Sequence, residues 1–225
     1  TYLFPGDIIS QKRPEGFPEN WADTPADYAM DPRITEDSTY RSQLIPALRS
    51  LPTLSIVTDL KNLFSKDQGI YSNPREHGRD WERPISMEWL QESDTHQINA
   101  GLRIQGGWFR DPKVTRKHSF RILFKRRYGE AKWRHRVFEE FGATDEFETL
   151  VLRAGGNDGY AWRDAQGTAQ YIRDEFGRRT VLAMGQTAPR GRFIHLYLNA
   201  CYWGLYNLCE RPDENFSSSY HGGSP

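Results

Sequence analysis

Alternating hydrophobic and polar positions dominate the chain from residue 51 onward and predict β-strands. Hydrophobic side chains recur at every second position in four stretches, at residues 54–57, 85–89, 100–104 and 120–124. Successive side chains of a strand point to opposite faces, so this period is typical of half-buried strands. Turn-forming residues separate the stretches, and we therefore expect antiparallel neighbours in one sheet.

The second half of the chain mixes helical and strand patterns. Hydrophobic residues at four-residue spacing predict two helices, one of which ends near Gly177. The expected elements are helices at 131–141 and 168–176, a strand at 150–153, a hairpin of 193–198 with 205–210, and a short helix over 213–220. Together these elements predict an α+β fold, with a mainly antiparallel sheet and a few packed helices.

The first fifty residues have a different character. Prolines at positions 5, 14, 18, 25, 32 and 46 disfavour long helices there. Short helices are expected to begin at Pro32 and to cover residues 42–48. We therefore divide the chain into an irregular, proline-rich N-terminal segment (residues 1–50) and a folded domain (residues 51–225). Both ends are expected to have been cut from a longer protein.

Composition narrows the class of protein. The chain has 225 residues, enough for one domain with a sizeable core or for two small ones, and its 13% aromatic content argues against disorder. No stretch approaches the roughly 20 apolar residues of a membrane-spanning helix, so we expect no integral membrane segment. The two cysteines cannot form a disulfide framework or a four-cysteine zinc site.

Positive charge is concentrated in residues 110–136, which hold eleven basic and two acidic residues. This block either is a solvated charged face or attracts anions such as phosphate. Nucleic-acid binding is an alternative, because four aromatic residues (Phe120, Phe124, Tyr128 and Trp133) interleave with the basic ones. The strand period places Phe120 and Phe124 in the core, so we expect no nucleic-acid partner.

The predicted strand over residues 117–124 carries the first candidate chemistry. Its hydrophobic residues share one face, which leaves Lys117, Ser119 and Arg121 together on the other. Two cations fixed on a strand are suited to holding a polyphosphate. The alternative is an ordinary strand with two hydrated cations.

Candidate carboxylates lie further along the chain. Asn157 and Asp158 follow the end of the strand at 150–153, and their oxygens suit a hard cation such as Mg²⁺ or the orientation of a hydroxyl nucleophile. The alternative is a simple turn, because Asn-Asp-Gly is also a turn sequence. Glu210 ends the predicted hairpin and could pair with Lys117, bind metal, or form a salt bridge with Arg211.

Several stretches together resemble a known family. In order, they are Gly69–Asn73, Trp81–Ser86, Gly101–Gly107, Lys117–Ile122, Leu152–Asp158, Tyr171–Asp174, His195–Asn199, Tyr202–Tyr206, Glu210–Asp213 and Gly222-Gly223. In this order and spacing the chain resembles the CotH kinase family of spore-coat proteins, across roughly residues 50–223.

The resemblance implies an atypical protein-kinase-like fold that uses ATP with Mg²⁺ or Mn²⁺ to phosphorylate Ser or Thr of protein substrates. It implies that Lys117 holds the nucleotide phosphates, with Arg121 and Arg103 in support. Glu210 is similar to the carboxylate partner of that lysine, and Asp158 to a catalytic or metal-binding acid, with Asn157 beside it. It also suggests a bacterial protein in an extracytoplasmic or cell-surface location.

The sequence departs from the family pattern at three points. The usual Lys-Lys before the Ser-Phe-Arg triplet is Lys117-His118, and the usual Asn-Gly of the hairpin is Asn199-Ala200. The family carries a further metal-binding aspartate segment after the Gly-Gly pair, whereas this chain ends at Pro225. The alternative function is therefore a non-catalytic surface or coat module that keeps the kinase-like fold.

Overall fold

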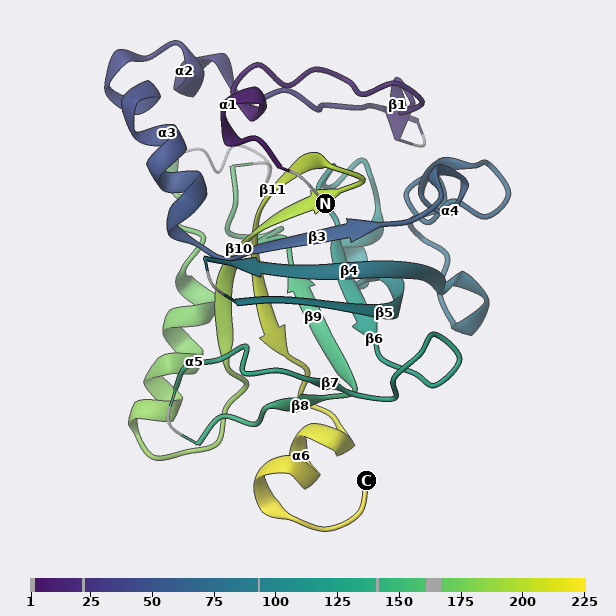
Figure 1. Cartoon of the computed structure of the whole chain (residues 1–225), viewed down its shortest axis with the longest axis vertical. Helices are drawn as coiled ribbons and strands as arrows, with labels where there is room; N and C mark the ends of the chain where they lie inside the picture. The colour runs from purple at the N-terminus through teal and green to yellow at the C-terminus, as the bar shows by residue number, and fades with distance from the viewer. Residues whose placement is uncertain (1–2, 22, 93, 141, 161–166) are drawn as a thin grey trace.

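A closed barrel of seven strands forms the centre of the molecule (Figure 1). The computed structural model describes residues 3–21, 23–92, 94–140, 142–160 and 167–225. The barrel strands are β3 (Thr53–Val57), β4 (Arg83–Gln91), β5 (Asp94–Gln105), β6 (Ser119–Leu123), β9 (Thr149–Arg153), β10 (Gly191–Leu198) and β11 (Cys201–Glu210). This architecture confirms the predicted α+β fold with a mainly antiparallel sheet.

Neighbouring barrel strands are antiparallel with one exception. Around the barrel their order is β10, β11, β9, β6, β5, β4 and β3. The exception is the parallel pair of β3 and β10, in which Thr53 lies opposite His195. This pair closes the sheet on itself, so none of its seven strands remains an open edge.

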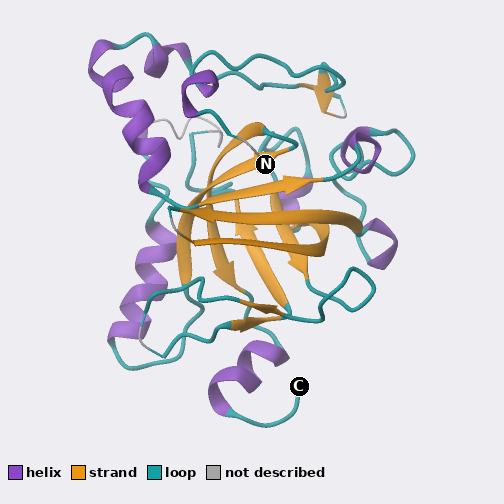
Figure 2. Ribbon diagram, viewed as in Figure 1, coloured by secondary structure: helices purple, strands orange, loops and turns teal. Residues whose placement is uncertain are grey.

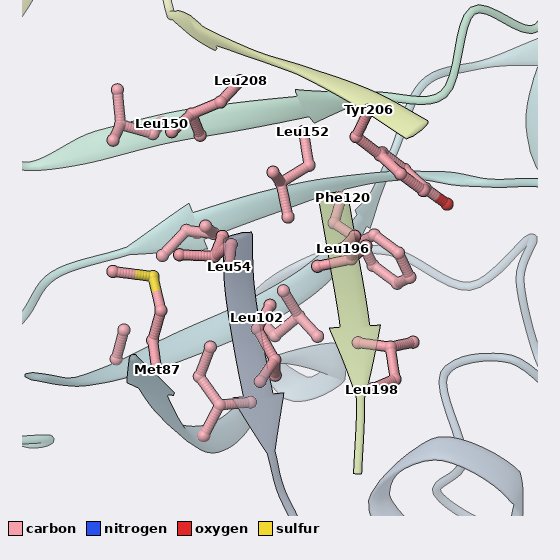
Figure 3. Close-up of a cluster of buried hydrophobic side chains, with 14 of the residues drawn as sticks. Leu54, Met87, Leu102, Phe120, Leu150, Leu152, Leu196, Leu198, Tyr206 and Leu208 are labelled. Atoms are coloured by element: carbon pink, nitrogen blue, oxygen red, sulfur yellow. The ribbon is translucent and has the colours of Figure 1, made fainter. Parts of the chain in front are cut away.

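Alternation along the strands places one hydrophobic face inside the barrel. Figure 3 shows this core, to which all seven strands contribute fully buried side chains. The side chains labelled there are Leu54, Met87, Leu102, Phe120, Leu150, Leu152, Leu196, Leu198, Tyr206 and Leu208. Phe120 and Phe124 lie in this core, as their spacing predicts, and so does Trp133. Three of the four aromatic residues considered for nucleic-acid stacking are thus enclosed.

The predicted helix at 131–141 is wrong. The chain there is extended, and β7 (Trp133–Arg134) pairs with β8 (Glu146–Phe147) below the barrel strands in the view of Figure 2. A further backbone hydrogen bond runs from His135 N to Asp145 O (2.8 Å). Trp133 and Val137 are both fully buried, so their four-residue spacing reflects insertion into the core rather than a helical face. Phe141, the last residue of the predicted stripe, lies outside the described residues.

The second predicted helix is displaced along the chain. Helix α5 spans Arg173–Ala183 and passes through Gly177 instead of ending there. Phe176, expected on the buried stripe, is 70% exposed. The helix instead buries Glu175, which accepts a hydrogen bond from Asn207 Nδ2 of β11 (3.1 Å). Polar contacts therefore attach α5 to the outside of the barrel. The hydrophobic period of the sequence consequently predicts this helix at the wrong residues.

The N-terminal segment contains more structure than its prolines suggest. Its elements are α1 (Pro5–Ile8), β1 (Asn20–Trp21), β2 (Thr24–Pro25), α2 (Pro32–Thr35) and α3 (Ser38–Ser50). The start of α2 at Pro32 is confirmed. The exclusion of a long helix is wrong, because α3 has thirteen residues and includes Pro46. Asp37 caps its first turn, and Leu44 and Leu48 anchor its inner face.

The remaining elements connect the barrel strands or cover its ends. Short helices α4 (Leu60–Phe64), η1 (Arg79–Trp81) and η2 (Trp108–Arg110) lie in the loops, and α6 (Glu214–His221) follows β11. Helix α6 matches its prediction, and Asp213 caps it by accepting from Phe216 N (3.2 Å). In Figure 1 the N-terminal segment lies at the top of the barrel and α6 at the bottom.

The hairpin of β10 and β11 is confirmed, with a tighter turn than expected. Asn199 and Ala200 form it with φ angles of 48° and 64°. This left-handed conformation is costly for alanine. The side chain of Asn199 compensates by bonding the backbone of Thr58 twice, accepting from its N–H and donating to its carbonyl (both 2.8 Å).

Candidate nucleotide groove on the outer face of the barrel

A groove of about 420 Å³ lies on the outer face of β6, β9 and β11, strands that are neighbours in the barrel (Figure 1). Ser119, Val151 and Cys209 line it from these strands, because each alternates with a core residue of its own strand. Lys117, Arg153 and Arg211 add positive charge to its walls. The predicted polar face of the strand at 117–124 is therefore the face that carries this groove.

Lys117 occupies one end of the groove, two residues before β6 begins. Its Nζ donates a hydrogen bond to the carbonyl of Leu205 (2.5 Å) and lies 4.4 Å from the centre of the Tyr206 ring. The left-handed Gly204 leaves room for it, since a Cβ there would lie 3.2 Å from Nζ. Burial lowers the pKa of Lys117 to about 7. An anion bound beside this amine would therefore draw a proton onto it.

Arg121 lies beside the groove with an unsatisfied donor. It is directly opposite Arg103 of β5 and Val151 of β9, so all three side chains share the outer face. Its Nε is buried and has no hydrogen-bond partner in the part of the chain that the structure describes. Burial, together with the charges of Arg211 and Arg103, lowers the pKa of Arg121. Such an arrangement of like charges favours an anion between them.

Arg103 is held by a carboxylate that the sequence analysis did not assign a role. Glu82, whose side chain is fully buried, accepts hydrogen bonds from Arg103 Nε (2.7 Å) and Lys125 Nζ (2.8 Å), and also from Arg127. Tyr128 donates its hydroxyl to the other oxygen (2.9 Å). Burial opposes ionisation of Glu82, but these hydrogen bonds lower its pKa to about 2. The single negative charge of Glu82 therefore pairs with three cations, and an excess of positive charge remains around it.

The expected pairing of Glu210 with Lys117 is wrong. Both residues line the groove, but Glu210 lies five positions after Leu205 on β11, which corresponds to roughly 17 Å. Its carboxylate accepts instead from the backbone N–H of Arg190 (2.8 Å) and the hydroxyl of Tyr220 (2.5 Å). Burial raises the pKa of Glu210. This carboxylate thus joins α6 to the lower end of the barrel.

Asp158 is a buried anchor of the chain before α5. Its two oxygens accept from the backbone N–H groups of Gln170 (3.0 Å) and Arg173 (3.1 Å), and one also lies 3.3 Å from Arg173 Nη1. Asn157 lines the groove beside it. Within the described ranges, no three histidine, cysteine, aspartate or glutamate side chains are grouped to hold a metal ion. Both oxygens of Asp158 are thus engaged within the fold, and a metal-binding role for Asp158 and Asn157 stays a prediction.

The groove offers no cysteine nucleophile. Cys209 lines it, but its thiol is buried, and burial raises the pKa of Cys209 to about 11. The thiolate is the reactive form, so this residue serves as a small packing group.

Comparison with protein families shows to which family the chain belongs. The family model described as CotH kinase protein matches residues 102–224, more than half of the chain and all of the groove's strands β6, β9 and β11. The chain belongs to the CotH kinase family. Membership suggests a kinase-like protein, and it suggests the use of ATP and a divalent metal in general terms. No curated protein matches the chain.

Two expectations concern the location of the protein, namely the lack of a membrane-spanning segment and an association with a surface. No helix among the described residues is long and apolar enough to cross a membrane. CotH proteins are a spore-coat family, which is consistent with association with a surface.

Proposed function

We propose that this CotH kinase family member is an ATP-dependent phosphotransferase that phosphorylates Ser or Thr of protein substrates. The groove on the outer face of the barrel holds the triphosphate. The observation that carries the proposal is the unsatisfied Nε of Arg121, which lies opposite Val151 of the groove and Arg103 and feels the positive charge of Arg211. A buried guanidinium donor without an acceptor is costly, and a phosphate oxygen is the partner that its geometry fits.

Phosphoryl transfer depends more on charge neutralisation and positioning than on covalent chemistry. The amine of Lys117 is held by the carbonyl of Leu205 on β11, and Arg121 lies on β6, so both side chains are positioned before the nucleotide arrives. In the reaction, the bond from the γ-phosphorus to the bridging oxygen of ADP breaks. A bond to the acceptor hydroxyl oxygen forms, and the hydroxyl proton leaves to water.

Mg²⁺ or Mn²⁺, when bound with the nucleotide, would supply further positive charge on the phosphate oxygens. Catalytic roles for Asp158 and Glu210 stay predictions, because hydrogen bonds within the fold already engage their carboxylates. The atypical kinase-like arrangement of the fold is likewise part of this proposal.

The decisive test compares Lys117→Met with wild type. Methionine keeps much of the packing over Tyr206 but removes the charge. With γ-labelled ATP and either metal, we expect transfer to a serine-rich protein to fall about 100-fold, the usual cost of one key electrostatic group. Arg121→Gln should have a similar effect. Lys61→Met, an exposed lysine on α4, is the matched control and should leave transfer unchanged.

Nucleotide affinity gives a second readout of the same lysine. Because burial holds the pKa of Lys117 at about 7, the free protein loses this charge as the pH rises above 7. Binding of ATP must then return a proton to the amine, so affinity should fall with pH, by up to about tenfold per unit. Calorimetry between pH 7 and 9 measures the slope. A slope that Lys117→Met leaves intact would contradict the proposal.

A non-catalytic surface module is the second candidate. It is favoured by the lack of a grouped set of metal ligands among the described residues. On this reading, neither ATP nor metal raises the melting temperature. A dose-dependent rise would exclude it in this form, because a ligand that binds only the native state stabilises it. A rise without any transfer would identify a nucleotide-binding protein that is not a kinase.

A further inference from the structure

A second and larger groove, of about 680 Å³, begins where the first one ends. Lys117 lines both, and it is the only described residue that the two grooves share. One wall of the second groove is the loop of residues 112–117, the opposite wall belongs to the N-terminal segment, and Trp203 of β11 lies between them. A ligand in the second groove would therefore meet a phosphate held at Lys117.

The wall from the N-terminal segment is firmly docked. Trp21 packs against Trp203 with ring centres 5.2 Å apart and donates its Nε1–H to the hydroxyl of Tyr28 (2.9 Å). Gln11 bonds the backbone of Tyr202 twice, accepting from its N–H (2.7 Å) and donating to its carbonyl (3.2 Å). This wall lies outside the residues that the family model matches.

Charge in the second groove is unevenly distributed. Lys113 and Arg116 are exposed, and neither side chain forms an ion pair with another described residue. On the opposite wall Asp31 is neutralised by Arg33 at 2.6 Å, which leaves the carboxylate of Asp27 as the negative charge there. The cations of the loop therefore outnumber the uncompensated acid, and the groove favours an acidic ligand.

We propose that this groove binds the acceptor segment of the protein substrate, a Ser- or Thr-bearing peptide with acidic side chains beside the hydroxyl. The inference rests on the proposed kinase function. In-line transfer needs the acceptor on the side of the γ-phosphate away from ADP, and the shared Lys117 places the second groove there. Lys113 and Arg116 select the acidic flanks, and the N-terminal segment forms the facing wall.

The test uses fluorescent heptapeptides with a central serine and flanking residues that are all Glu, all Lys or all Gln. Anisotropy without nucleotide should show preferential binding of the Glu peptide. The double variant Lys113→Glu/Arg116→Glu should weaken that binding by at least about tenfold, because two attractive contacts become repulsive. The matched control Lys61→Glu/Arg49→Glu makes the same change of charge on α4 and α3, and should leave the preference in place.

Three outcomes separate this inference from the proposed function. Loss of the preference in the groove variant, with the ATP-induced rise in melting temperature retained, supports both. Equal binding of all peptides to wild type, or a preference that survives the groove variant, overturns the inference even if ATP binds. A preference that the variant abolishes, in a protein that never binds ATP, supports the peptide groove and refutes the kinase. With active protein, the variant should raise KM for the Glu peptide and leave kcat unchanged.

Discussion

Two buried glutamates, Glu82 and Glu210, have opposite electrostatic surroundings. Glu82 accepts hydrogen bonds from three cations and a tyrosine, and its pKa falls to about 2 despite its burial. Glu210 accepts from one backbone N–H and one hydroxyl, with the Arg190 guanidinium 3.9 Å away, and burial raises its pKa. Burial alone therefore does not decide the charge of a carboxylate, because the number of cationic donors does.

The regions around Glu82 and Glu210 therefore have different structural roles. Around Glu82 a negative charge organises Arg103, Lys125 and Arg127, and Arg103 lies directly opposite Arg121. Around Glu210 a carboxylate with few donors holds α6 against the barrel. The first region gathers positive charge on one face of the barrel, and the second joins two parts of the fold.

The largest effect is expected for Glu82→Gln, which leaves three cations around a neutral amide. Breaking a buried ion network in this way should lower the free energy of unfolding by roughly 3 kcal/mol at pH 7, measured by urea denaturation. The native pKa of about 2 lies below the ordinary 4.5, so the native state holds fewer protons. This stabilisation is present above pH 4.5 and is lost as the pH falls towards 2.

The variant should therefore differ most from wild type at neutral pH and converge with it in acid. Glu130→Gln is the control, because Glu130 is 68% exposed and pairs loosely with Arg134 at 3.9 Å. Its effect should stay below about 1 kcal/mol. Equal losses in the two variants would show that the network around Glu82 does not stabilise the barrel.

An intermediate effect is expected for Gly101→Ala on β5. A Cβ at Gly101 would lie 2.6 Å from Tyr128 Cε2 and 2.8 Å from Glu82 Cγ, so the network must move. We expect a loss of about 2 kcal/mol, as for other overpacked sites, in the same denaturation assay. In Gly6→Ala on helix α1 the new methyl would meet no atom within 4 Å, and its stability should match wild type. A neutral Gly101→Ala would mean that Glu82 does not need this close approach.

The smallest effect, about 1 kcal/mol, is expected for Glu210→Gln, because this carboxylate accepts from two neutral donors and has one arginine 3.9 Å away rather than three cations in contact. Its dependence on pH should have the opposite sign. The raised pKa means that the native state prefers the protonated carboxyl, so this contribution is lost as the pH rises through that pKa. The advantage of wild type over the variant should shrink with rising pH. An advantage that grows instead would remove the contrast with Glu82.

The strands of the barrel could be predicted because alternation is a local property. Stretches such as 100–104 and 120–124 carry their period within five residues, and both are strands. The pairing of strands, in contrast, is not a local property of the sequence. The contact of β3 with β10 joins Thr53 to His195 across more than half of the chain, so a closed barrel could not be anticipated.

The helices show the limit of a hydrophobic period. The spacing of Trp133 and Val137 is helical, yet both side chains enter the core from an extended segment. On α5 a buried carboxylate and its arginine partners replace the hydrophobic face that the pattern requires.

The candidate site was predictable in part for the same reason. Alternation placed Lys117 and Arg121 on the polar side of their strand, and the groove lies on that side. The partners of these residues come from elsewhere. Glu82 contacts Arg103 because Gly101 has no side chain, and Glu210 accepts a hydrogen bond from Tyr220. Neither contact can be recognised from the sequence.

The parallel contact of β3 with β10 has a practical consequence for anyone who trims this protein. The recognised family region begins at Leu102, after β3, β4 and most of β5. A polypeptide that began there would lack β3 and β4. Because β3 is the neighbour of β10, the backbone amide and carbonyl groups of β10 that face β3 would lose their partners. Open strand edges of this kind pair with one another between molecules, so the shortened polypeptide should aggregate rather than fold as a smaller domain.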